Sequence, residues 1–381
     1  MPIYKIEGVK KDGLQKYNVR VNYLNSDGVK KQLTRITFGL EEAKDLEKKL
    51  LDEVKEKLDG SHGKTTIDQL FTEYIATKQH DVRTTTAHKY EKEYELYIKP
   101  NLEHVKLCKL TVPMLQKWKS YIESLEIGLT TRNHAYSTLR ILLNYAVRME
   151  YIPKNPLTAI GCFKDADYSK AEIAYYTADE FLKYINAVKQ YAEKRTAECR
   201  CLSEWDYYIF FNIAFYTGMR KGEILALKWS DLDADLINVR RSIQQKVKGF
   251  ADIETPPKSK SSIRTLQIPF PLMKVFEEHR ERQKVTGKFT EEYRVCGGEQ
   301  CIRGASLGDK NRFYANISGQ KRIRVHDFRH AHVSVLANEG INIQEIARRL
   351  GHAKVEITWN TYSHLYPREQ EKAVDVLNRI A

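Results

Sequence analysis

The sequence predicts a multidomain, mainly α-helical protein that begins with a three-stranded β-sheet followed by a helix. Three observations support this fold class: strict alternation of apolar and polar residues near the start, helical periodicity from about residue 66 to 156, and mixed helices and strands after about residue 172. At roughly 150 residues per domain, a chain of 381 residues has room for two or three domains. Its 42% hydrophobic content is enough for packed cores.

The first predicted domain covers residues 1–60. Apolar and polar side chains alternate over residues 16–23, which is typical of a half-buried strand. Turn residues flank this run at 11–13 and 25–28, and a third strand is expected at about 31–38. Apolar residues at three- and four-residue steps then predict a helix over 40–58, ended by Gly60.

The net charge of +13 predicts a polyanionic partner, with nucleic acid first and an acidic membrane surface second. Residues 1–37 contain eight Lys and Arg against three acidic residues, whereas the predicted helix contains more acidic than basic residues. The positive charge therefore belongs to the polar face of the sheet, with Lys16, Asn18 and Arg20 as candidate DNA contacts. A β-ribbon of this size fits the major groove of DNA. The alternative is a structural sheet whose lysines are only solvated.

Several classes of protein are excluded by composition. No stretch approaches about 18 uninterrupted apolar residues, so no membrane span is expected. The N-terminal residues lack the apolar region of a signal peptide, which predicts a reducing compartment. Six cysteines are too few for a disulfide scaffold, and the C-x-C and C-x4-C pairs lack the usual C-x2-C step of a zinc site. We therefore expect free thiols, no metal and no cofactor.

The second predicted domain, residues 64–160, is a set of helices over about 66–79, 84–99, 111–125 and 130–150. A capping box at Thr66 opens the first of these helices, and the last has an apolar stripe of Leu139, Leu142, Leu143 and Ala146. Basic residues are interleaved with these helices, and Arg83, Lys89 and Arg132 suit contacts with DNA phosphates. Equally, such residues serve only to solvate a helical bundle. A linker near 160–173 leads to the third domain, residues 172–381, where a capping box at Thr177 opens the first helix.

The third domain contains a set of cationic and nucleophilic residues at informative spacing. In T-G-M-R-K-G-E, a helix is expected to end at Gly218, and Arg220 opens the next helix, where backbone amides favour an anion. His326 and Arg329 are three residues apart and therefore share one helix face. His352 follows in L-G-H, and Tyr362 comes ten residues later. Each element is weak alone, but their order and spacing are specific.

The pattern R…H-x-x-R…L-G-H-x9-Y resembles the tyrosine recombinase (phage integrase) family, from about residue 66 to the end. The three-part layout is most similar to integrases of conjugative transposons, whose first domain binds arm-type DNA and whose second binds the core site. The resemblance implies a nucleophile at Tyr362 and a catalytic lysine in the hairpin 256–265. Lys258, which follows two prolines, is favoured over Lys260. The other implied catalytic residues are Arg220, His326, Arg329 and His352.

The resemblance implies a site-specific recombinase that cleaves and rejoins DNA through a 3′-phosphotyrosyl intermediate, integrating and excising a mobile element. It also implies a tetramer on DNA formed through a C-terminal helix, although that helix can instead pack in cis. An excisionase and a DNA-bending host factor are further possible partners, and the setting is the bacterial cytoplasm, at the nucleoid. Two alternatives are kept: a relaxing enzyme like type IB topoisomerases, and a non-enzymatic DNA-binding regulator.

Overall fold

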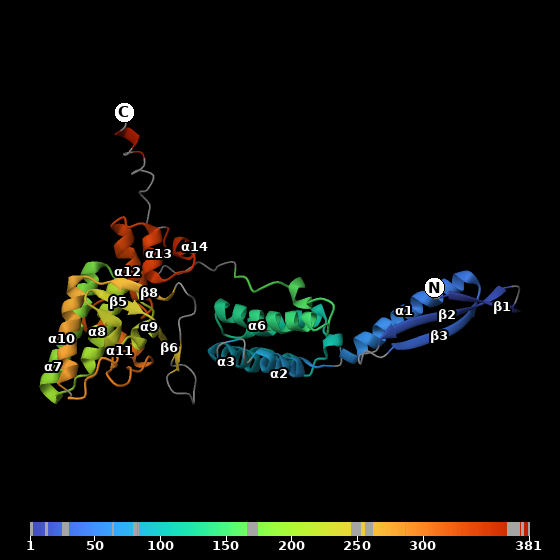
Figure 1. Cartoon of the computed structure of the whole chain (residues 1–381), viewed down its shortest axis with the longest axis horizontal. Coiled ribbons are helices and arrows are strands. Elements are labelled where there is room, and N and C mark those ends of the chain that lie inside the picture. Colours follow the sequence, from blue (N-terminus) through green and yellow to red (C-terminus); the bar gives the residue numbers. More distant parts are fainter. Residues whose placement is uncertain are drawn as a thin grey trace. The chain divides into compact units, whose positions relative to one another are not determined.

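The computed structural model describes most of the chain and divides it into two compact units, residues 1–169 and 170–381 (Figure 1). The unit boundary falls inside the linker predicted at 160–173. Helices dominate both units, and the N-terminal sheet is present, so the predicted fold class is confirmed. The described residues are 3–11, 14–24, 30–62, 65–78, 82, 84–165, 174–244, 253–255, 262–285, 287–363, 374 and 377–379.

The first unit opens with an antiparallel sheet backed by one helix. Its elements are β1 (Ile3–Lys11), β2 (Leu14–Leu24), β3 (Lys30–Phe38) and α1 (Leu40–His62), and the strand order is β1-β2-β3. The alternation in β2 buries Val19 and Val21 against Leu50 of α1. The opposite face carries Asn18, which lies between Tyr4 of β1 and Ile36 of β3 in the strand register. Strand periodicity thus separates an apolar face from a polar face, as predicted.

The end of α1 differs from the prediction. The sequence predicts a cap at Gly60, but the helix continues to His62. Glycine adopts the left-handed conformation of a helix end and the right-handed helical conformation with similar ease, so its presence permits an end without imposing one. Here Gly60 lies within the last turn.

The rest of the first unit is a helical bundle with its own core. Its elements are α2 (Ile67–Lys78), α3 (Thr84–Glu93), a π-helical segment (Tyr94–Ile98), α4 (Lys99–Leu102), α5 (Val112–Ser124) and α6 (Leu129–Arg148). The predicted apolar stripe of α6 is buried, with Leu139 and Leu143 fully enclosed. Thr66 and Gln69 form the predicted capping box of α2. Because this core is separate from that of the sheet, a division at residues 60–64 stays a reasonable prediction.

The second unit combines helices with two small sheets. Its elements are α7 (Ala178–Cys199), α8 (Ser203–Thr217), α9 (Lys221–Ala226), β4 (Leu232–Asp233), β5 (Leu236–Val239), β6 (Ser242–Gln244), β7 (Ile253–Thr255), β8 (Arg264–Gln267), α10 (Phe270–Lys284), α11 (Ser306–Ile317), α12 (Asp327–Asn338), α13 (Ile343–Leu350) and α14 (Val355–Tyr362). Strands β4, β5 and β8 form one sheet, and β6 pairs with β7. Thr177 and Glu180 form the predicted capping box of α7. Aromatic side chains, including Phe181, Phe211 and Phe328, fill the core.

The turn between α8 and α9 depends on Gly218. Its φ is +64°, which is the left-handed conformation that closes many helices. A Cβ at this position would lie 2.7 Å from Cδ2 of His332 and 3.0 Å from a methyl carbon of Leu350. His332 is buried, and its Nδ1 is bonded to the carbonyl oxygen of Phe215 at 2.9 Å, so the ring is held in place. The turn therefore requires glycine, and it determines where Arg220 begins α9.

We predict that Gly218→Ala destabilises the second unit more than Gly319→Ala does. Both glycines have nearly the same positive φ, +64° and +67°, but a Cβ at Gly319 would meet nothing within 4 Å. The left-handed conformation costs roughly 1–2 kcal/mol at either site, and overpacking at Gly218 adds roughly 1–3 kcal/mol. Urea unfolding of both variants checks the difference, and equal losses would show that the contact with His332 relaxes freely.

Candidate active site

Arg220 lies at the first turn of α9, where Glu223 fixes both its backbone and its side chain. The backbone N–H of Arg220 donates to Oε2 of Glu223 at 2.9 Å, and its Nη1 donates to Oε1 at 2.9 Å. The Arg220 side chain remains 39% exposed, so it combines a fixed position with access from solvent. The predicted end of one helix at Gly218 and start of the next at Arg220 are confirmed.

Glu223 is also bound by a second arginine, Arg264, which the sequence analysis did not single out. Nη2 of Arg264 donates to Oε2 of Glu223 at 2.9 Å, and its Nε donates to the carbonyl oxygen of Arg349 at 2.6 Å. Burial raises the pKa of Glu223, but the charge and hydrogen bonds of Arg264, with those of Arg220, outweigh burial and lower it. The carboxylate is therefore ionised and holds two cations.

Arg329 lies in the first turn of α12 and is almost completely buried. Its Nη1 donates to the carbonyl oxygen of Gly218 at 2.7 Å, and its Nη2 donates to the carbonyl oxygen of Leu350 at 2.8 Å. The same Nη2 lies 2.8 Å from Nε2 of His352. One guanidinium thus joins the end of α8, the end of α13 and a predicted catalytic histidine.

His352 follows Gly351, whose left-handed turn ends α13. Because an arginine only donates, Nε2 of His352 accepts from Arg329, and Nδ1 carries the hydrogen toward the Thr358 hydroxyl at 2.8 Å. Burial, followed by the charges of Arg329 and Arg220, lowers the pKa of His352 to about 4. The imidazole is therefore neutral at neutral pH, with its one N–H directed to Thr358 and its other ring nitrogen bound by Arg329.

Tyr362 is the last residue of α14 and is only 4% exposed. Burial raises the pKa of its phenol to about 12, although Arg329 acts in the opposite direction. The hydroxyl lies 2.5 Å from Nδ1 of His330, a residue absent from the predicted set. Burial and the neighbouring His326 lower the pKa of His330 to about 4, so this imidazole is also neutral.

His326 immediately precedes α12, and its ring centroid lies 5.5 Å from that of His330. Burial and then Arg329 lower the pKa of His326. The family resemblance implies a catalytic role for His326, and His330 lies four residues later on the same helix face. That spacing follows directly from H-D-F-R-H and identifies the second histidine once a helix is assumed.

The structure thus brings together Arg220, His326, Arg329, His352 and Tyr362, whose charges act on one another's pKa values. Lys258 and Lys260 lie outside the described residues. The described chain continues at Ser262, whose carbonyl oxygen accepts from Arg264 Nη1 at 3.2 Å. Both residues belong to the predicted hairpin 256–265, so the described end of that hairpin contacts Glu223 through Arg264.

The candidate DNA contacts are placed on separate parts of the first unit. Lys16, Asn18 and Arg20 lie on the polar side of β2, and Arg83 is outside the described residues. Lys89 is paired with Glu93 at 3.5 Å. Arg132 donates through Nη2 to the carbonyl oxygen of Glu123 at 3.2 Å, so part of its fork already binds the end of α5.

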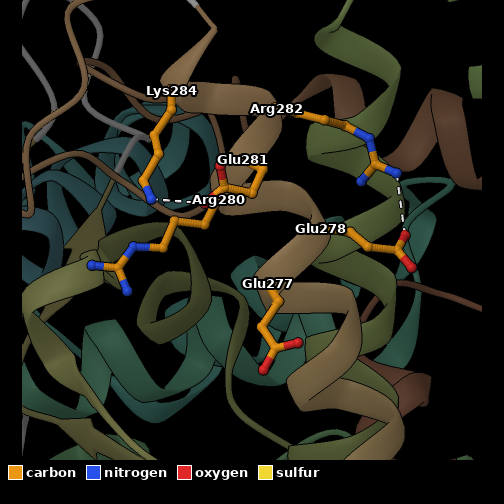
Figure 2. Close-up of a pocket in the computed structure, with 6 residues that line it drawn as sticks. All are labelled: Glu277, Glu278, Arg280, Glu281, Arg282 and Lys284. Carbon is orange, nitrogen blue, oxygen red and sulfur yellow. Dashed lines mark hydrogen bonds and ion pairs between the residues drawn. The ribbon is translucent and has the colours of Figure 1, made fainter.

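Other features of the described chain do not resemble a second reaction centre. Within the described ranges, no three His, Cys, Asp or Glu side chains are grouped as metal ligands, and no helix is long and apolar enough to cross a membrane. A hollow on α10 is lined only by charged side chains of that helix, and two ion pairs form among them, Arg282 with Glu278 at 3.2 Å and Lys284 with Glu281 at 2.7 Å (Figure 2).

Family models match both the helical bundle of the first unit and the second unit, which contains the Arg, His and Tyr cluster. Residues 176–369, just over half of the chain, match the phage integrase family, and residues 66–122 match the N-terminal SAM-like domain of phage integrases. The chain therefore belongs to the phage integrase family.

Two bacterial proteins align with most of the chain. The ICEBs1 integrase of Bacillus subtilis (strain 168) is 26% identical over 351 residues, which cover 88% of this chain and 89% of that protein. A "tyrosine recombinase XerC-like" protein of Caldanaerobacter subterraneus is 29% identical over 313 residues, or 76% of each chain.

Solved structures share the fold. The Tn1549 transposon integrase bound to circular intermediate DNA matches with a TM-score of 0.67 at 17% identity, covering 83% of this chain and 99% of that one. A λ integrase dimer bound to a COC′ core site matches with a TM-score of 0.57 at 18% identity, covering 96% and 94%. A λ integrase tetramer bound to a Holliday junction matches at 0.55 and 16%, covering 93% and 96%.

We predict that Glu223→Gln lowers the free energy of unfolding by roughly 3–5 kcal/mol, because it leaves buried Arg264 without its counter-charge. The matched control is Glu345→Gln in the exposed pair with Arg348, where solvent screening should leave the free energy of unfolding nearly unchanged. Urea unfolding measures both.

We predict that the stability lost in Glu223→Gln depends on pH. The pKa of folded Glu223 is lowered, so its stabilisation is present above the unfolded pKa and is lost as pH falls through the folded value. The difference between the wild type and Glu223→Gln should therefore be largest near neutral pH and shrink in acid. A difference that grows in acid would contradict the ion-pair account.

Proposed function

We propose that this protein is a site-specific DNA recombinase that cleaves and rejoins DNA through a 3′-phosphotyrosyl intermediate. The observation that supports this most directly is the convergence of Arg329 from α12, His352 from the turn after α13 and Tyr362 from α14 on one cluster. Family membership and the names of the relatives, which include an integrase of a transposon bound to DNA, support the same activity.

The chemistry of these side chains suits attack on a phosphodiester. An arginine fork matches the geometry of phosphate oxygens, so Arg220 and Arg329 would stabilise the charge that grows on the non-bridging oxygens. The phenol oxygen of Tyr362 would form a bond to phosphorus while the bond from phosphorus to the 5′ oxygen breaks. A lysine of the 256–265 hairpin would protonate that 5′ oxygen. The phosphotyrosine conserves the energy of the cut, so rejoining needs no ATP.

The first unit supports a division of DNA binding between two surfaces. The basic polar face of β1–β3 suits arm-type DNA, and the helices of residues 64–160 suit the core site. Because the two parts share one chain, binding by one raises the effective concentration of the other at nearby DNA. We further propose that the protein integrates and excises a mobile element in the bacterial cytoplasm, at the nucleoid.

Assembly is proposed as a tetramer on DNA in which the C-terminal segment contacts a neighbouring subunit. In the part of this segment that is described, Val374 is 50% and Leu377 is 64% exposed, so both apolar side chains are available for such a contact. An excisionase and a DNA-bending host factor are proposed as accessory partners. Strand exchange between paired sites, rather than relaxation of supercoils by a monomer, distinguishes this function from that of a topoisomerase-like enzyme.

We predict that Tyr362→Phe binds DNA with unchanged affinity but forms no covalent protein–DNA adduct, because only the nucleophilic oxygen is removed. The core site is first obtained by sequencing the recombination junctions formed in cells. A nicked suicide substrate with that site then traps the adduct, which a denaturing gel detects. Undiminished adduct in the Phe variant would place the nucleophile elsewhere, and no adduct in the wild type would refute the proposed reaction.

We predict that Lys258→Ala slows adduct formation about 100-fold or more, whereas Lys260→Ala changes it little. A substrate with sulfur in place of the bridging 5′ oxygen tests the assignment further, because a thiolate leaves without a proton. This substrate should restore the rate of the Lys258→Ala variant. If only Lys260→Ala slows cleavage and is rescued, Lys260 is the acid.

A further inference from the structure

The phenol of Tyr362 has a hydrogen-bond partner that the sequence motif does not assign. Nδ1 of His330 lies 2.5 Å from the phenol oxygen, and the two ring centroids are 5.3 Å apart. His330 is on the first turns of α12, next to Arg329, while Tyr362 ends α14. The contact therefore joins two helices at the atom that is proposed to attack phosphorus.

The protonation states define the direction of this bond. The pKa of the buried phenol is raised to about 12 and that of His330 is lowered to about 4, so both groups are neutral at neutral pH. A neutral phenol donates its only hydrogen, and a neutral imidazole offers one unprotonated nitrogen as acceptor. Nδ1 of His330 lies within hydrogen-bond distance of the phenol oxygen, which is the position that a general base needs to remove the phenol proton.

We propose that His330 is a further catalytic residue, which accepts the proton of Tyr362 during strand cleavage and returns it during rejoining. This proposal rests on the proposed recombinase reaction. As the bond from the phenol oxygen to phosphorus forms, the phenol hydrogen passes to Nδ1, which makes an imidazolium. The bond to the 5′ oxygen breaks with its electron pair, and a separate acid protonates that oxygen. Rejoining reverses every step, so His330 ends neutral.

Bound DNA strengthens this base. After burial, the neighbouring positive charges hold the pKa of His330 down, with Arg324 and Arg329 among them. A phosphodiester beside Arg329 offsets that charge, so an imidazolium becomes less costly when the substrate is present. The titratable and charged groups around the histidine–phenol pair in the described structure are His326, Asp327, Arg324 and Arg329.

His326 is the competing candidate for the same task. Its ring lies edge-on to His330, with centroids 5.5 Å apart, and the phenol of Tyr362 donates its hydrogen bond to His330. An imidazole next to Arg220 and Arg329 suits a contact with the phosphate instead. Comparing the two histidines in one assay therefore separates proton acceptance from phosphate binding.

The test uses the full-length protein, the junction-derived suicide substrate and single-turnover adduct formation. In His330→Asn, Oδ1 occupies about the position of Nδ1, so the phenol keeps an acceptor that cannot take a proton. We expect this variant to be slower by about 100-fold or more. The defect should persist on the substrate with a bridging 5′ sulfur, because the base takes its proton from the phenol and not from the leaving group. His104→Asn makes the same change at an exposed histidine and should leave the rate unchanged.

Distinct results separate the two levels of the proposal. If the wild type forms adduct and Tyr362→Phe does not, but His330→Asn stays within about threefold of the wild-type rate, His330 is not the base and the recombinase function stands. If the sulfur substrate restores the rate of His330→Asn, His330 acts on the leaving group and not on the phenol. If His330→Asn forms adduct faster than the wild type, His330 restrains the phenol. Both outcomes overturn the proposal. DNA affinity and unfolding of each variant show whether folding is intact.

Discussion

The buried guanidinium of Arg329 is the contact on which the site depends. Its two terminal nitrogens bind the carbonyl oxygens of Gly218 and Leu350 and the ring nitrogen of His352. Gly218 ends α8, whereas Leu350 and His352 lie at the end of α13 and just after it. A buried charge is costly unless it is surrounded by hydrogen-bond partners. The segments must therefore converge to satisfy Arg329, and that convergence brings the predicted catalytic residues together.

Local patterns predicted much of the fold because one physical period determines each of them. The alternation in β2 correctly separates the face with Val19 from the face with Asn18, because strand side chains alternate with a period of two. Capping boxes at Thr66 and Thr177 marked two helix starts correctly. The predicted end of α1 at Gly60 was wrong, since the helix continues to His62. Glycine can end a helix or continue it, and only the context of the whole helix decides between the two.

The site was predicted in part. Linear order and spacing selected a set of five residues, whose functional roles stay predictions: Arg220, His326, Arg329, His352 and Tyr362. The partnership of Arg264 with Glu223 was not visible, because the two residues are 41 positions apart and meet only after the sheet has folded. His330 was overlooked for a different reason. Helical spacing placed it beside His326, but only the position of α14 shows which histidine reaches the phenol.

The two glycine-ended helices have an electrostatic consequence. The last carbonyl groups of a helix carry about half a negative elementary charge, and Arg329 receives those of both α8 and α13. Two such ends partly offset the charge of Arg329 before any DNA binds, although that charge still lowers the pKa values of the neighbouring histidines. The long-range attraction for a phosphate then comes mainly from the more exposed Arg220. Arg329 acts as a directional donor at short range, and the site divides the capture of an anion from its alignment.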